Sequence, residues 1–178
     1  FTLLPAYLTA ARAAKNPALP PSRRINLGCI GVGGRAAGAI PSLTSDGHAV
    51  PVAFCDVDFE GSRKIEGNLE TWPDVARFQD FRLMLDKMGK DIDAVSVVIP
   101  DHNHFVAAIH AMAMGKHVYV EKPLTHTFAE AEILMRAEKK FKVVTQMGNQ
   151  GHTSSGAAQF KQMVAAGLTA DVYRIDAW

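Results

Sequence analysis

The chain has 178 residues, enough for one full domain with a sizeable core and part of a second. Hydrophobic residues make up 48% of the chain, charged residues 21%, and the formal net charge is +1. This balance gives no electrostatic reason to expect a nucleic acid or a membrane surface as a partner. No apolar run approaches the roughly 20 residues that a membrane-spanning helix needs.

The first 24 residues differ from the rest in composition. Residues 1–14 are apolar and rich in alanine, and residues 15–24 contain three prolines, which is typical of a linker. Ala11-Arg12-Ala13 has the small-residue spacing that a signal peptidase accepts. Two interpretations stay open for this arm. It is the remnant of an export signal in a periplasmic or otherwise exported protein, or it is a tag or surface arm on a cytoplasmic one.

From Arg24 onward, short apolar segments alternate with segments of helical spacing. The predicted strands are short and continuously apolar, as in a buried parallel sheet; they cover residues 25–30, 50–55, 75–78, 94–99, 117–120 and 142–147. The predicted helices cover residues 37–43, 59–69, 81–88, 103–114, 127–140 and 154–166. Gly115 is predicted to lie just beyond the end of the fourth helix, and residues 127–130 form a capping box that opens the fifth. This alternation predicts an α/β fold, a doubly wound parallel Rossmann sheet over residues 25–148.

Three further features follow from this element order. Residues 171–178 alternate in part, which predicts a strand at the start of an α+β second domain over residues 149–178. Pro41 should kink the first helix or mark a late start. Cys29 and Cys55 fall in the first two strands and are expected to be buried free thiols, close together if those strands are neighbours.

A glycine-rich loop follows the first predicted strand and precedes the first helix, with the pattern Gly31-x-Gly33-x-x-Ala36. In this context Gly31 permits a tight turn, Gly33 lets the backbone approach a pyrophosphate, and Ala36 allows close packing of helix and strand. The helix N-terminus supplies N–H groups for phosphates, and Arg35 adds a cation. A glycine loop by itself also closes ordinary turns.

The second predicted strand ends at Asp56, where an acidic residue supports the glycine loop. A carboxylate there accepts hydrogen bonds from both adenosine ribose hydroxyls and repels a 2′-phosphate, which favours NAD over NADP. Asp58 is a second candidate for this role. The structural alternative for Asp56 is a helix cap. Loop and acid together predict a dinucleotide site.

Polar segments follow three later strands, at residues 100–104, 121–123 and 148–152. Ligands of doubly wound sheets bind outside the carboxyl ends of the strands, so these segments are candidate site residues. Either Asp101 or Asn103 is expected to cap the next helix. A zinc site made by His102, His104 and His152 is an alternative, but cysteine ligands are absent, and we predict no metal.

Lys122 directly follows a buried strand and precedes Pro123. A lysine held there is expected to be partly desolvated, which lowers its pKa and suits it to proton transfer. The alternative is a solvated surface lysine. A cis peptide bond at Pro123 would fix the turn that aims Lys122 into the cleft.

Four motifs together resemble the Gfo/Idh/MocA oxidoreductases: Gly-Val-Gly-Gly-Arg at 31–35, Cys-Asp-Val-Asp at 55–58, Pro-Asp-His-Asn-His at 100–104 and Glu-Lys-Pro-Leu-Thr at 121–125. The similarity runs from about Arg24 to the end of the chain. Residues 146–152 resemble a branch whose members are often exported and often act on sugars. The resemblance implies hydride transfer between nicotinamide and a hydroxyl-bearing carbon of a sugar, polyol or sugar derivative.

The resemblance also implies site residues and partners. Lys122 would be the catalytic or substrate-orienting lysine. The cofactor-binding residues would be Gly31, Val32, Gly33, Gly34, Arg35, Asp56, Pro100, Asp101, His102, His104, Glu121 and Asn149. Of these, Gly31, Gly33 and Asp56 would hold the adenosine and pyrophosphate half. The partners would be a small sugar or polyol and further copies of the full-length chain.

The chain departs from the family pattern in three places. Ala36 stands at the third glycine position, and Asn103 stands where an aromatic residue is typical. The chain also ends at Trp178, where we expect the first strand of the domain that usually carries the catalytic Asp and His. We therefore expect a fragment or a split chain, inactive alone. Two alternatives stay open: an NAD-dependent glycosidase or lyase using transient sugar oxidation, and a non-catalytic NAD-binding module.

Overall fold

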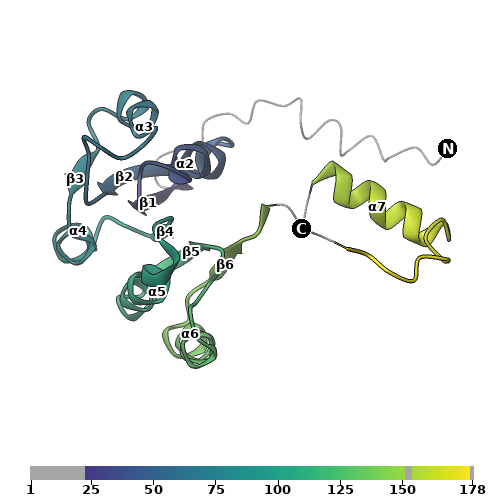
Figure 1. Ribbon diagram of the computed structural model, residues 1–178. Helices are drawn as coiled ribbons and strands as arrows, with labels where there is room; N and C mark the ends of the chain where they lie inside the picture. Colours follow the sequence, from purple (N-terminus) through teal and green to yellow (C-terminus); the bar gives the residue numbers. More distant parts are fainter. Residues whose placement is uncertain (1–22, 151–153, 177–178) are drawn as a thin grey trace. The chain divides into compact units, whose positions relative to one another are not determined.

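The computed structural model describes residues 23–150 and 154–176 (Figure 1). The predictions for residues 1–22 and for His152 lie outside the described residues. The chain divides into two compact units, one ending at Met147 and the other beginning at Gly148, and each is described by itself. No helix within the described ranges is both long and apolar enough to cross a membrane.

Six strands form one sheet in the order β3-β2-β1-β4-β5-β6. They are β1 (Ile25–Ile30), β2 (Ala49–Cys55), β3 (Ala76–Phe78), β4 (Ala94–Val97), β5 (His117–Glu121) and β6 (Thr145–Gly148). The pairings from β3 through to β5 are all parallel. The chain runs outward from β1 in one direction and returns to β4 on the other side, so the strand order reverses between β1 and β4. The predicted doubly wound Rossmann sheet is confirmed.

Helices cover both faces of this sheet (Figure 1). On one face lie α2 (Ala36–Thr44) and α3 (Glu66–Thr71); on the other lie α4 (Phe81–Met88), α5 (His104–Ala113) and α6 (Phe128–Phe141). Each face has its own cluster of buried apolar side chains. Strands buried on both faces explain why their sequences are continuously apolar instead of alternating.

Local sequence signals set several helix ends. The side chain of Thr127 accepts from the Glu130 amide, and Glu130 bonds back, completing the predicted capping box of α6. Asp80 caps α4 by accepting from the Arg82 amide at 2.9 Å. Gly115 follows α5 with a φ of +75°, as predicted for a residue just beyond a helix end. Pro41 lies inside α2, which begins ahead of it at Ala36.

The helix predicted over residues 59–69 is wrong in its first half. Only α3, at Glu66–Thr71, is helical there. The Asp58 carboxylate accepts from the amides of Glu60 and Gly61 at 3.1 and 2.7 Å, which stabilises a turn instead of a helix. Lys64 then takes a left-handed φ of +62°.

The second unit contains α7 (Ser155–Ala165), close to its predicted bounds. Ser154 caps this helix by accepting from the Ala157 amide at 3.2 Å. Residues 171–176 form no strand, contrary to the prediction. A strand is defined by its ladder of hydrogen bonds, and the described residues offer this segment no partner strand.

Cys29 and Cys55 are buried free thiols, as predicted. They lie on adjacent strands but do not share a face. Cys29 pairs in register with Phe54 and belongs to the core beneath α2, whereas Cys55 belongs to the core beneath α4 to α6. Burial raises the pKa of each thiol to about 12, and for Cys55 the charges of Asp80 and Asp56 add to the effect.

Candidate functional site

A cleft of about 800 Å³ opens at the carboxyl edge of the sheet, at the point where the strand order reverses. The loops after β1, β2, β3 and β4 all contribute to its lining. Its volume falls within the range of small-molecule and cofactor pockets, about 300 to 1,000 Å³. This is also the place where open α/β sheets bind their ligands.

The glycine loop (residues 31–35) forms one wall of this cleft. Gly31 has a φ of +87°, and a Cβ at this position would lie 2.0 Å from the carbonyl oxygen of Val98. Its amide donates to the carbonyl of Cys55 at 2.8 Å. Gly31 therefore lets the loop turn tightly between the ends of β2 and β4, as predicted.

Gly33 and Gly34 differ in what surrounds them. A Cβ on Gly33 would lie 2.8 Å from Cβ of Ser62, so the chain's own β2–α3 connection already requires a glycine there. A Cβ on Gly34 would meet no atom of the described residues within 4 Å, and Gly34 lines the cleft with a φ of +55°. The open side of the loop is thus at Gly34, next to the N-terminus of α2.

Asp56 holds the glycine loop in place. Its Oδ2 accepts from the amides of Val32 and Gly33 at 2.9 and 3.3 Å. Its Oδ1 accepts from the Asp58 amide at 3.1 Å and from the Ser62 hydroxyl at 2.9 Å. The helix-cap alternative is wrong, because Ile65 occupies the cap position of α3. The carboxylate lines the cleft, so it places a negative charge beside the loop.

The loop after β3 contributes residues that sequence reasoning missed. Gln79, Asp80, Phe81 and Arg82 line the cleft, together with His110 from α5. The guanidinium of Arg82 bonds Asp80 at 2.6 Å and lowers the pKa of that carboxyl to about 2. These residues directly follow the third predicted strand, and the rule that ligands bind at the carboxyl ends of the strands could have identified them as candidate site residues.

His110 gives this part of the cleft an unsatisfied polar atom. Its ring packs edge-on against Phe81 with centroids 5.6 Å apart. Its Nε2 is buried, and no hydrogen-bond partner for it occurs in the part of the chain that the structure describes. Buried polar atoms are nearly always paired, so an orphan at a cleft is typical of a site that a ligand or a water completes.

The segment after β4 divides between the cleft and the solvent. Pro100 lines the cleft, and so does Asn103. Asp101 and His102 are exposed on a short 3-10 turn, where the Asp101 carboxylate accepts from the His102 amide at 3.0 Å. Neither belongs to the cleft lining, so their predicted contact with the cofactor stays a prediction.

His104 is buried, with 1% of its surface exposed. Its Nδ1 lies 2.6 Å from the carbonyl oxygen of Pro123, and its Nε2 lies 2.8 Å from that of Ile99. Both nitrogens are thus engaged, which argues against the predicted direct cofactor contact and against the zinc alternative. Among the described residues, no group of three or more potential ligands could hold a metal ion.

Glu121 links the glycine loop to the turn that carries Lys122. It is buried, with 4% of its surface exposed. It accepts from Arg35 Nε at 3.2 Å and from the Tyr119 hydroxyl and Lys122 amide at 3.3 Å each. Arg35, predicted as a cation for phosphates, therefore bridges two strand ends in this structure.

Lys122 itself is exposed, and the predicted partial desolvation is wrong for the described part of the chain. The lysine turn (residues 121–124) leaves β5 at the rim of the sheet, where the first unit places no covering element over it. The peptide bond between Lys122 and Pro123 is cis, as predicted. Asn149 lies in the second unit, so its assignment to the nicotinamide end stays a prediction.

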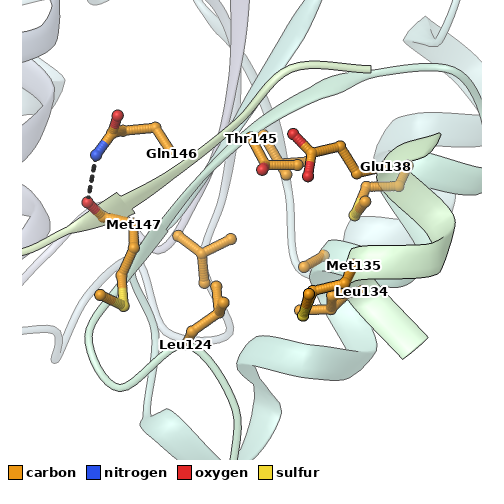
Figure 2. A pocket seen from close by; sticks show the side chains of 11 residues that line it. Leu124, Leu134, Met135, Glu138, Thr145, Gln146 and Met147 are labelled. Atoms are coloured by element: carbon orange, nitrogen blue, oxygen red, sulfur yellow. Dashed lines mark hydrogen bonds between the residues drawn. The ribbon is translucent and has the colours of Figure 1, made fainter. Parts of the chain in front are cut away.

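A smaller hollow of about 140 Å³ lies among α5, α6, β5 and β6, and none of the predicted site residues line it. Figure 2 shows its apolar walls, with Leu124 and Met147 facing Leu134 and Met135. This hollow and the cleft beside the glycine loop share no lining residue, so the hollow is not part of the cofactor cleft.

Comparison with known proteins identifies this architecture. The sequence model of a family described as an oxidoreductase family with an NAD-binding Rossmann fold, GFO_IDH_MocA, matches residues 25–149. The chain belongs to this family. Its glycine loop, Asp56 and the cleft at the switch point all lie within the matched residues, and the residues present fit a dinucleotide. Gly34 leaves the loop open, and Nε2 of His110 is buried with no hydrogen-bond partner among the described residues.

The relatives of this chain carry names of different enzyme activities. The chain is 33% identical over 123 residues to glycosyl hydrolase family 109 protein 1 of Bacteroides fragilis, covering 65% of this chain and 26% of that relative. It is 30% identical over 151 residues to an inositol 2-dehydrogenase/D-chiro-inositol 3-dehydrogenase of Lacticaseibacillus casei, covering 81% and 41%. The chain thus spans less than half the length of these relatives.

A solved structure supports the fold. The WlbA dehydrogenase of Bordetella pertussis, in complex with NADH and UDP-GlcNAcA, superimposes with a TM-score of 0.69 at 22% identity, covering 82% of this chain and 43% of that one. At this identity the likeness concerns the fold. It agrees with the strand order and the helix layers described above.

Proposed function

We propose that the full-length protein is an NAD-dependent oxidoreductase that transfers a hydride between nicotinamide and a hydroxyl-bearing carbon of a sugar, polyol or sugar derivative. The observation that carries this proposal is the cleft at the strand switch point, bounded by a glycine loop that Asp56 holds in place. The names of family relatives, which include an inositol dehydrogenase, support the substrate class.

In the proposed reaction a carbon–hydrogen bond of the substrate breaks and its electron pair leaves with the hydrogen to the nicotinamide ring. The hydroxyl on the same carbon loses its proton and becomes a carbonyl. Lys122, at the same edge of the sheet as the cleft, is the residue of this chain that we assign to hold or move that proton. Its exposed amine is free to meet a substrate.

We propose a preference for NAD over NADP, based on the negative charge at the cleft rim. Asp56 lines the cleft, and Asp58 follows it by two residues. A 2′-phosphate placed against Asp56 meets a like charge, whereas ribose hydroxyls donate to it.

Steady-state kinetics with the purified full-length protein test the proposal. The protein is incubated with NAD or NADP and with myo-inositol, levoglucosan or UDP-N-acetylglucosamine, and reduced nicotinamide is followed by absorbance. We expect turnover with at least one substrate, a higher kcat/KM with NAD, and loss of turnover in Lys122→Ala. Absence of reduced nicotinamide with a wide sugar panel, together with absence of NAD binding by calorimetry, would refute it.

A second candidate function is supported by the glycosyl hydrolase relative. In this version a sugar hydroxyl would be oxidised transiently to a ketone, with its hydride held on bound NAD, and elimination of the neighbouring glycosidic bond would release the aglycone and leave an unsaturated ketone. Water would then add to this ketone, and the hydride would return to the sugar. A nitrophenyl glycoside distinguishes the two functions. The glycosidase version requires NAD-dependent release of nitrophenol with no net NADH, and release without NAD would exclude it.

We propose three further properties of the full-length protein. The proline-containing segment of residues 15–24 supports export, which fractionation of the source cells tests. We propose self-association, which sedimentation tests. The near-neutral net charge of +1 supports the absence of a nucleic-acid or membrane-surface partner.

A further inference from the structure

We propose that His104 is a positioning residue that fixes the lysine turn relative to the cleft. The inference rests on the proposed function, because it assigns His104 a role in placing Lys122. The observation that carries it is a buried imidazole ring whose two nitrogens face carbonyl oxygens from two different strand-end loops, Ile99 after β4 and Pro123 after β5. We call this arrangement the His104 clamp.

One side of this clamp belongs to the cleft. Nε2 of His104 lies 2.8 Å from the carbonyl oxygen of Ile99. Ile99 lines the cleft two residues after β4, and its neighbour Val98 donates its amide to Ile30 at 2.8 Å. The Ile99 carbonyl is therefore tied to the end of β1, where the glycine loop begins.

The other side belongs to the lysine turn. Nδ1 of His104 lies 2.6 Å from the carbonyl oxygen of Pro123, the residue after Lys122. Within the described residues, the Lys122 amide donates to the neighbouring side chain of Glu121, at 3.3 Å. The contact with His104 thus ties this turn to a different element, the first residue of α5.

The ring is itself well fixed. His104 begins α5, whose buried face includes Ala107, Ala108 and Ala111, each fully inaccessible. Carbonyl oxygens only accept, so a ring nitrogen donates to its carbonyl only while it carries a proton, and the neutral ring, with one N–H group, donates to one of the two carbonyls at a time. A phenylalanine ring of similar size would leave both carbonyls without this donor, and glutamine would supply one amide group in place of two ring nitrogens.

Two measurements on the full-length protein test the clamp, using His104→Phe, His104→Gln and the control Met84→Ala. Met84 lies on α4 and is buried in the core cluster that also contains the three alanines of α5 named above. It lies outside the cleft lining. The first measurement is hydrogen–deuterium exchange of the peptide covering residues 122–127. We expect about tenfold faster exchange in His104→Phe and unchanged exchange there in Met84→Ala.

The second measurement separates kcat from NAD affinity, using the substrate from the panel above that gives the highest turnover. We expect His104→Phe to lower kcat roughly 100-fold. Its dissociation constant for NAD should stay within about threefold of the wild type, because His104 does not line the cleft. His104→Gln should recover part of the loss in kcat, and Met84→Ala should leave kcat unchanged below its melting temperature.

Each failure has a distinct meaning. Unchanged exchange at residues 122–127 in His104→Phe overturns the clamp. Faster exchange with unchanged kcat, while Lys122→Ala lowers kcat, overturns the positioning role. Full activity in Lys122→Ala, or no dehydrogenase activity in the wild type, overturns the proposed function instead, and hydrogen exchange alone then decides whether the clamp exists.

Discussion

The glycine loop and the lysine turn lie at the same edge of the sheet, but their functional groups are held in different ways. In the glycine loop, the atoms expected to meet the cofactor also hold the fold together. Gly33 fits against Ser62, and Asp56 binds two loop amides. In the lysine turn, the backbone is tied by His104 and Glu121, while the amine of Lys122 is exposed.

This difference indicates how substitutions should behave in the two regions. A change at Gly31, Gly33 or Asp56 should alter stability and cofactor binding together. A change at Lys122 should remove chemistry and leave stability intact, because its side chain is exposed.

The largest expected effect is on turnover in Lys122→Ala. Loss of a residue that moves a proton typically lowers kcat by about 100- to 10,000-fold. The free energy of unfolding should change by less than about 0.5 kcal/mol, as for other exposed positions. Lys139→Ala, an exposed lysine on α6, is the matched control and should retain full turnover. Loss of stability in Lys122→Ala would remove the contrast between the two regions.

The next largest effect is on stability in Gly31→Ala. Its new methyl group would overlap the carbonyl of Val98, and alanine is strained in the left-handed backbone conformation of Gly31. The free energy of unfolding should therefore fall by at least about 3 kcal/mol. Gly34→Ala is the matched control, because Gly34 shares the positive φ but its new methyl group would meet no atom of the described part of the chain within 4 Å. There we expect a loss of about 1 to 2 kcal/mol, measured by urea denaturation. Equal losses in the two variants would contradict the close approach at Gly31.

Asp56 should affect both properties at once. Asp56→Ala leaves the amides of Val32 and Gly33 without their acceptor, which should lower stability by about 1 to 3 kcal/mol. NAD affinity should fall about 10- to 100-fold, since a hydrogen bond to a charged group is lost. Asp56→Asn keeps one acceptor oxygen and removes the charge, so the ratio of NADP to NAD affinity should rise about tenfold. Calorimetric titration with both cofactors measures this, and an unchanged ratio would contradict the charge argument.

The sequence signals that predicted this fold are local ones. Continuous apolar segments predicted the strands, and the glycines and the Thr127 capping box predicted where helices begin. The strand order followed from the family of doubly wound sheets, so the position of the cleft could also be predicted. The residues after β3 escaped prediction although the same rule applied to them.

Other features depend on contacts between distant residues, and a local pattern does not encode them. Asp56 was expected at the ribose, but its bonds to Val32 and Gly33 arise only when β1 and β2 pair. His104 was grouped with the cofactor ligands because its loop follows β4, whereas its ring spans to Pro123, 19 residues away. The exposure of Lys122 likewise depends on which elements cover the edge of the sheet where β5 ends, and the residues around Lys122 in the sequence do not determine this.

The smallest expected effect concerns the bridge between the two regions. Arg35 in the glycine loop contacts Glu121 in the lysine turn at 3.2 Å, but the arginine side chain is 57% exposed. Solvent screening therefore leaves a coupling free energy of about 0.2 to 1 kcal/mol, which a double-mutant cycle of Arg35→Met and Glu121→Gln measures by urea denaturation. Arg35→Met alone should cost little, because Glu121 keeps the Tyr119 hydroxyl and the Lys122 amide as partners. A coupling of several kcal/mol would mean that the two regions respond to substitution as one unit, contrary to the contrast drawn between them.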